Sequence, residues 1–128
     1  MTYYFNKLLL LEFEAAIQKV VAALKQEGFG VLSDIDVKAT LKQKINVDFR
    51  PHRILGACNP SLAHKALSAE DKIGTMLPCN VIVQDLWGGN IEVAAINPLV
   101  AMERVGKPEL LLIAQDVAAK LERVVAAL

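Results

Sequence analysis

Apolar residues recur along the chain at two kinds of spacing, and together they predict a mixture of helices and strands. Spacings of three and four residues predict a helix from Glu12 to Glu27 and a longer one from Glu109 to Leu128. A tight turn at residues 87–90 is typical of a hairpin between two strands. Short apolar runs predict five strands in all, at Tyr3–Leu10, Phe29–Ile35, Arg53–Cys58, Val81–Leu86 and Ile91–Ile96.

Shorter helices are indicated by residues that favour helix ends. Asp36 is suited to cap a helix from Val37 to Ile45, and Asn46 is suited to end it. Asn59 is suited to cap a second helix, from Pro60 to about Ala69. Pro60 suits the first position of this helix, because a proline there loses no hydrogen bond. The remaining segments are predicted as a loop and a single helical turn, at Asp71–Leu77 and Pro98–Met102.

This order of elements predicts an α+β fold: one two-layer domain over residues 1–128. About five mainly antiparallel strands would form the sheet, with the two long helices on one face and short helices beside them. Two of the strands are apolar on both faces, at Val81–Val83 and Val93–Ile96. We therefore expect a short helix or another subunit to cover the second face of the sheet.

Composition strengthens the expectation of a second subunit. The chain has 128 residues, of which 54% are hydrophobic and 22% charged, so it can form a substantial core as a single domain. The apolar surplus favours a homodimer interface. The formal net charge is 0, which argues against a protein held on nucleic acid or on acidic membranes by bulk charge.

Nothing in the sequence predicts a membrane or secreted protein. The longest apolar runs, such as Val20–Leu24, have about five residues, whereas a membrane span needs about 18. The first residues lack the basic head and cleavage site of a signal peptide. We expect a cytoplasmic protein whose two cysteines stay reduced.

Candidate chemistry is concentrated between residues 49 and 83, which hold both cysteines and both histidines of the chain. Two similar corners occur there, Cys58-Asn59-Pro60 and Pro78-Cys79-Asn80, and they meet if their strands are neighbours. The Cys58 thiol lies next to a predicted helix N-terminus, which favours the thiolate. We expect a ligand-binding pocket near these corners.

Three interpretations of the corners remain open. Cys58 and Cys79, with His64 as a possible helper, would suit Cu(I) or Zn(II), and the two thiols alone would suit redox exchange. Free cysteine also packs as a small hydrophobic residue, in which case the corners only shape the fold. Asn59 and Asn80 are either ligands of the site or simply cap and turn residues. No cofactor is identified.

A second candidate site is the basic segment at residues 38–53, which carries five basic residues and one acidic residue, a net charge of +4. Lys38 and Lys42 are one helical turn apart, and with Arg53 they could hold a phosphate or carboxylate beside the cysteine corner. The alternative is an ordinary solvated helix face.

No complete catalytic motif is present, so no catalytic residue is predicted and the sequence favours a binding protein over an enzyme. The preferred hypothesis is a cytoplasmic homodimer that binds a small molecule or a partner near Cys58 and Cys79. The alternatives are a thiol or soft-metal protein that uses the same cysteines, and a purely structural or interaction module.

Six strings of the sequence carry a resemblance to a known family: Gly28–Leu32, Asp34–Lys42, Ile54–Pro60, Leu62–His64, Leu77–Val81 and Ala95–Pro98. They resemble the bacterial and archaeal proteins grouped as domain of unknown function, family 302. The resemblance implies a curved sheet with two main helices on one side, as in the TATA-binding protein, and a homodimer. It implies no activity, and a shared fold carries none across. His52 stands where we expect an aromatic residue, so it is not treated as a functional residue of the family.

Overall fold

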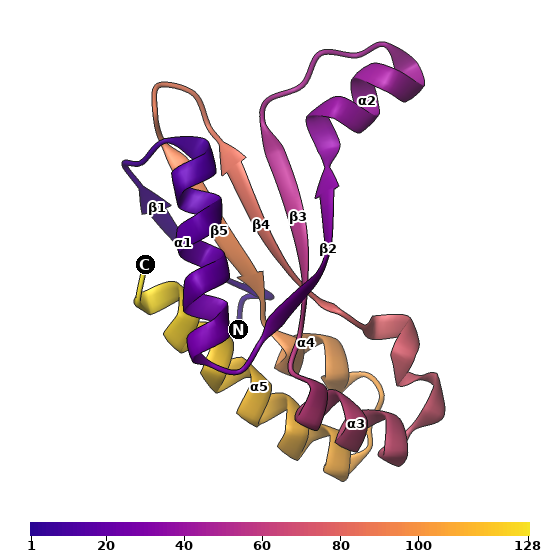
Figure 1. The fold of residues 1–128 in the computed structure, drawn as a ribbon. Coiled ribbons are helices and arrows are strands. Elements are labelled where there is room, and N and C mark those ends of the chain that lie inside the picture. Colours follow the sequence, from indigo (N-terminus) through magenta and orange to yellow (C-terminus); the bar gives the residue numbers. More distant parts are fainter.

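Five strands form one antiparallel sheet in the computed structural model, which describes residues 1–128 (Figure 1). Their order across the sheet is β1-β5-β4-β3-β2, so the first and second strands of the chain lie at opposite edges. The predicted number of strands and their antiparallel arrangement are confirmed. The strands are β1 (Tyr4–Leu9), β2 (Gly30–Asp36), β3 (His52–Cys58), β4 (Cys79–Asp85) and β5 (Ile91–Ile96).

Five α-helices and one short 3₁₀ helix connect and cover the strands. The predicted long helices and short helices form within one or two residues of their expected bounds. They are α1 (Phe13–Gln26), α2 (Val37–Ile45), α3 (Pro60–Ala69), the 3₁₀ helix η1 (Asp71–Met76), α4 (Pro98–Glu103) and α5 (Pro108–Ala126). None of the helices combines the length and the hydrophobicity needed to cross a membrane.

The caps predicted for the short helices are present. The Asp36 carboxylate accepts a hydrogen bond of 2.9 Å from the Ala39 N–H at the start of α2. At the end of the same helix Asn46 has a left-handed backbone, with φ of 55°. These local signals fix both ends of α2 without help from the core.

The loop predicted at Asp71–Leu77 is instead mostly η1. Ile73 in this segment is buried beside Ala66 of α3 and Met102 of α4. Two apolar residues in a six-residue stretch are too few to show a helical period, so the sequence did not indicate a helix here. The burial of Ile73 against α3 and α4 explains why the segment is ordered into a turn of helix.

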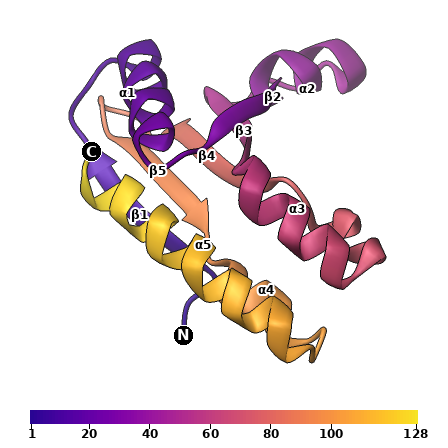
Figure 2. The ribbon, with the colours of Figure 1, turned by 60° about the horizontal axis from the view of Figure 1, so that its bottom comes forward.

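The two long helices cover the same face of the sheet, as predicted (Figures 1 and 2). Val20 of α1 and Leu121 of α5 belong to one buried cluster with Val81 and Val83 of β4 and Val93 of β5. The strand side chains that face the helices are fully buried, whereas their neighbours in sequence are less so. This alternation produces a two-layer domain with its core between the sheet and the helices.

The second face of the sheet carries a row of apolar side chains that none of the short helices buries. The register places Ile35, Ile54, Ile82 and Ala94 side by side across four strands. Ile54, Ile82 and Ala94 are half-buried and Ile35 is 48% exposed. Cover by a short helix of the same chain is therefore wrong, and cover by another subunit stays a prediction.

Polar side chains form a hydrogen-bonded row beside this apolar one. Gln84 Nε2 donates to Glu92 Oε1 at 2.7 Å, and Asn6 Nδ2 donates to Glu92 Oε2 at 3.0 Å. Gln84 Oε1 in turn accepts from Arg50 Nε at 2.9 Å and lies 3.1 Å from His52 Nδ1. Burial lowers the pKa of His52 despite its contact with Gln84. The polar side chains of this row therefore find their hydrogen-bond partners among one another.

Candidate functional site

The two cysteine corners lie side by side at one end of the sheet, as the sequence suggested. Strand β3 ends at Cys58, strand β4 begins at Cys79, and the register pairs Ala57 with Cys79. Asn59 then starts α3: its side-chain oxygen accepts a hydrogen bond of 3.2 Å from the Leu62 N–H. The strand register therefore brings together two segments that are twenty residues apart.

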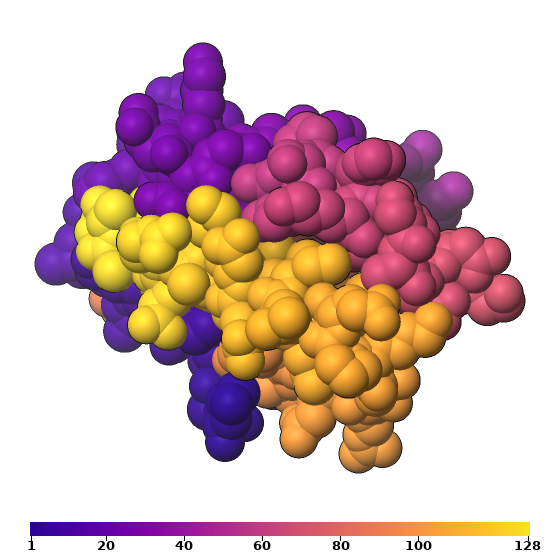
Figure 3. Space-filling model, turned by 90° about the horizontal axis from the view of Figure 1, so that it is seen from below, coloured from indigo at the N-terminus to yellow at the C-terminus, as the bar shows by residue number.

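An apolar cavity of about 50 Å³, here called the inner cavity, lies beside the corners. Both Cys58 and Cys79 line it, together with small residues of two helices, Ala66 of α3 and Ala114 of α5. Helices α3 and α5 lie next to each other on the face shown in Figure 3. The short side chains of the two alanines leave the space between the helices open.

A second, larger space of about 300 Å³, here called the outer groove, adjoins the inner cavity. Its lining includes Met76 at the end of η1, Asn80 and Ile96 on neighbouring strands, and Ala101 of α4. Four residues line both spaces, and we call them the shared wall: Pro78, Cys79, Pro98 and Met102.

Both cysteines are free thiols. Burial, together with a smaller effect of the nearby Cys58, raises the pKa of Cys79 to about 11. The Cys79 thiol therefore stays protonated near neutral pH. The thiolate expected at Cys58 stays a prediction.

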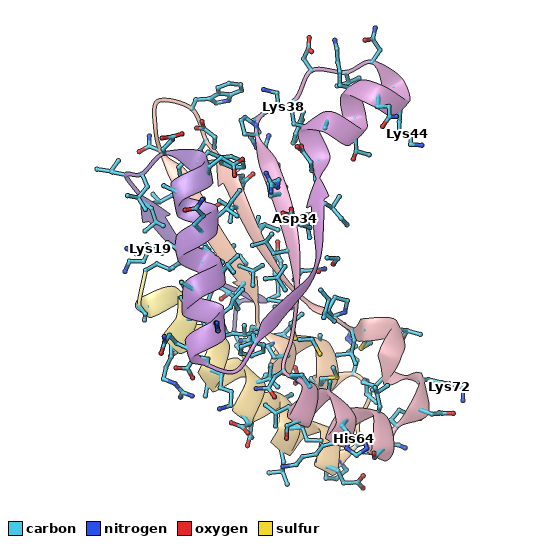
Figure 4. All side chains as sticks on the ribbon, viewed as in Figure 1. Lys19, Asp34, Lys38, Lys44, His64 and Lys72 are labelled. Atoms are coloured by element: carbon cyan, nitrogen blue, oxygen red, sulfur yellow. The ribbon has the colours of Figure 1, made fainter.

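The metal set predicted from the sequence does not form. His64 lies on the exposed side of α3, at the lower end of the molecule in Figure 4, and does not line the inner cavity. No group of three or more His, Cys, Asp and Glu side chains is placed to hold a metal ion. The helical position of His64 turns its ring away from Cys58 and Cys79, which corrects the expectation of a shared site.

The two asparagines of the corners differ in their surroundings. Besides capping α3, Asn59 donates a hydrogen bond of 3.5 Å from Nδ2 to the Glu27 carbonyl oxygen. The side chain of Asn80 makes no hydrogen bond within the chain, and it lines the outer groove. Asn59 is thus a structural residue, whereas the Asn80 amide is available to a ligand.

The predicted anion site at Lys38, Lys42 and Arg53 is not assembled. Arg53 donates to Asp34 through Nε at 2.8 Å and Nη2 at 2.6 Å, and through Nη1 to Glu14 at 3.1 Å. Lys42 pairs with Asp48 at 3.1 Å. Carboxylates of the same chain therefore pair with two of the three basic side chains that were expected to bind an anion.

The basic segment also lies far from the cysteines, which corrects the expectation that the two adjoin. Helix α2, with Lys38 and Lys44, stands at the opposite end of the molecule from His64 on α3 in Figure 4. Strand β3 runs between these ends, with seven residues from His52 to Cys58. At about 3.3 Å per residue it separates the two by roughly 20 Å.

Sequence reasoning missed the residues that close the inner cavity from the far side. Met102 of α4 and Leu110, Ala114 and Val117 of α5 come from the last third of the chain. The apolar spacing of the last helix indicated core positions for Leu110 and Val117, and both are buried. Nothing in the spacing distinguishes a core alanine from one that leaves a space.

The comparisons with known proteins agree with this fold. Residues 5–128 match the family model described as "Domain of unknown function DUF302". The chain is also similar to a solved structure titled "Crystal structure of uncharacterized conserved protein DUF302 from Bacillus stearothermophilus", with 28% identity and a TM-score of 0.90. That similarity covers 98% of both chains. No curated protein matches the chain. The chain belongs to the family of the domain of unknown function DUF302.

Proposed function

We propose that the protein is a cytoplasmic homodimeric binding domain that takes a small ligand at the inner cavity beside Cys58 and Cys79. The observation that carries the proposal is an open apolar space at the only place where the two cysteine corners, α3 and α5 converge. Ligand sites are concave and mostly apolar, with few polar groups. The inner cavity has this character, since 13 of its 16 lining residues are hydrophobic.

The size of the inner cavity limits what enters it. A volume of about 50 Å³ has room for a few water molecules, far less than the roughly 300–1,000 Å³ of sites for drug-sized ligands. An unfilled space of this volume costs about 1 kcal/mol of stability, at about 24 cal/mol per Å³. Occupation by a few ligand atoms would recover this free energy, which supports a binding role.

The apolar row on the second face supports the homodimer. Five strands about 4.8 Å apart, each of about six residues, present roughly 500 Å² of flat area. A stable interface buries about 800 Å² per partner. The exposed helix α2, which contains no buried residue, adjoins the sheet and adds to the available surface. A second copy packed on this face would cover Ile54, Ile82 and Ala94 and leave the inner cavity accessible from the other face.

Native mass spectrometry of protein purified without chelator or affinity tag tests the proposal. We expect a dimer that carries a small bound molecule. The bound molecule should be lost in Ala114→Val, which fills the inner cavity, and retained in Ala119→Val, an exposed position on the same helix. A monomer would overturn the homodimer, and a bare chain from several growth conditions would overturn the ligand.

The same spectra distinguish the thiol alternative. One metal ion per chain that disappears after alkylation of Cys58 and Cys79 would favour a soft-metal protein and contradict the proposal. A bare dimer with two free thiols would leave the cysteines as packing residues of a structural module. Each outcome thus selects one of the three hypotheses raised by the sequence.

A further inference from the structure

We propose that the outer groove and the inner cavity form one two-part site for an uncharged molecule with an apolar end and a neutral hydrogen-bonding group, such as a primary amide. This inference rests on the proposed function and names its ligand class. The apolar end would occupy the inner cavity, and the polar group would lie in the outer groove beside Asn80.

The shared wall connects the two spaces. Pro78, Cys79, Pro98 and Met102 line both the inner cavity and the outer groove. The two spaces are therefore adjacent and share part of their lining. A ligand in the groove of about 300 Å³ needs only a displacement within this wall to reach the cavity of about 50 Å³.

The wall contains side chains that adapt their shape. Two cysteines and three methionines are the sulfur-containing residues of the chain, and all but Met1 line one of the two spaces. Met102 lines both, and methionine is unbranched with three rotatable bonds, so it fills irregular gaps and rearranges readily. Met102 is the side chain best suited to move when a ligand passes from groove to cavity.

The lining provides no partner for a charged ligand. No Lys, Arg, His, Asp or Glu lines either space. Moving an ionised group from water into apolar surroundings without a partner is strongly unfavourable. A neutral apolar molecule meets no such cost, and it gains from the removal of its surface from water.

Asn80 supplies the polar contact. Its amide makes no hydrogen bond within the chain, and it carries both donors and an acceptor. A primary amide or an alcohol can both donate to this group and accept from it. Asn80 and Ile96 both line the outer groove, so the polar group of the ligand would lie beside an apolar side chain.

Three probes with the same chain length and different charge test the ligand class: hexanamide, hexanoate and hexylammonium. Titration calorimetry and NMR titration of the full chain at pH 7 should show hexanamide binding at least 10-fold more tightly than either ion. Asn80→Ala should weaken hexanamide about 3- to 10-fold, as expected for loss of neutral hydrogen bonds. Gln115→Ala, an exposed position outside both linings, should have no effect.

Chain length tests the connection between the two spaces. Ala114→Val should weaken hexanamide but not propanamide, which is too short to extend past the shared wall. Should Ala114→Val fail to fold, Ala63→Val alters the same cavity from α3. Equal loss for both amides would overturn the two-part site.

Other outcomes separate this inference from the proposed function. Hexanoate or hexylammonium binding as tightly as hexanamide would overturn the ligand class. A ligand seen by native mass spectrometry, together with no hexanamide binding, would overturn this inference alone. Absence of both would overturn the proposed function as well.

Discussion

Pro78 packs directly over Gly56. A Cβ atom built at residue 56 would lie 2.8 Å from Pro78 Cγ, and it would collide with Ser33 Oγ as well. The register places Gly56 opposite Asn80, so the missing side chain on β3 is what lets the corner before β4 lie flat against the sheet. The shared wall of the candidate site therefore depends on a glycine that lines neither space.

Gly56→Ala should lower the free energy of unfolding by about 1–3 kcal/mol, the usual cost of inserting atoms into a packed region. The Ser33 hydroxyl can rotate away, but the Pro78 ring cannot. Urea denaturation measures the effect. Gly30→Ala is the matched control on the neighbouring strand, since an added Cβ meets nothing within 4 Å there. A similar loss in both variants would contradict the packing explanation.

Asn59→Ala should cost about 1 kcal/mol through loss of the α3 cap. The 3.2 Å hydrogen bond from the Leu62 N–H would be lost, and with it the longer contact to the Glu27 carbonyl. Asn59→Asp keeps the capping oxygen and should retain most of the stability. Thermal melting that is unchanged in Asn59→Ala would show that the cap contributes little to α3.

Cys79 should make stability fall between about pH 9 and pH 11. Burial raises the thiol pKa from 9.0 to about 11 in the folded chain, so the unfolded chain releases this proton first as pH rises. Unfolding is thereby favoured within this window, by about 2 to 3 kcal/mol in total. Denaturation curves of the wild type and Cys79→Ala across this range isolate the effect from other titrating groups. Parallel curves for the two proteins would refute a strongly raised pKa.

Asp34 should contribute stability that is lost in acid. Hydrogen bonds from Arg53 lower the pKa of the Asp34 carboxyl. In the folded chain the carboxylate therefore stays ionised at lower pH than in the unfolded chain. The contribution is present above about pH 4 and disappears as pH falls through the lowered value. Because the pair is partly exposed, Asp34→Asn should cost at most about 1 kcal/mol at pH 7. A cost that persisted unchanged at pH 2 would contradict this ion pair.

Ala114→Val should stabilise the free protein while it closes the ligand site. Filling about 50 Å³ adds up to about 1 kcal/mol to the free energy of unfolding. The lower helix propensity of valine removes about 0.5 kcal/mol of this gain. Differential scanning calorimetry of Ala114→Val against Ala119→Val measures the net change, because the helix penalty is common to both. A lower melting temperature for Ala114→Val than for the control would mean that the inner cavity cannot accept the added methyl groups.

Local signals predicted much of the fold. Asp36, Asn46 and Asn59 act on backbone groups within three or four residues, so their effects can be read from neighbouring letters of the sequence. The same holds for the hairpin at Trp87, whose backbone has φ of 76°. Ile73 is the counterexample, because its order depends on α3 and α4 rather than on its neighbours.

The candidate site was only half predictable. Both cysteine corners were evident from their composition, and the strand register brings them together. The opposite walls come from Met102 and α5, and no local pattern links these to Cys58. The partners of Arg53 were not predicted either, because they are distant from it in the sequence. Asp34 lies on another strand and Glu14 lies on a helix.

The pairing of β1 with β5 has a consequence for the order of events during synthesis. Asn6 and Glu92 are joined by a hydrogen bond although they are 86 residues apart in the chain. Closing so long a loop carries a large entropic cost, and contacts of this kind slow folding. The remaining strands pair in sequence, β2 with β3, β3 with β4 and β4 with β5. The first strand to leave the ribosome is thus the last to find its place in the sheet.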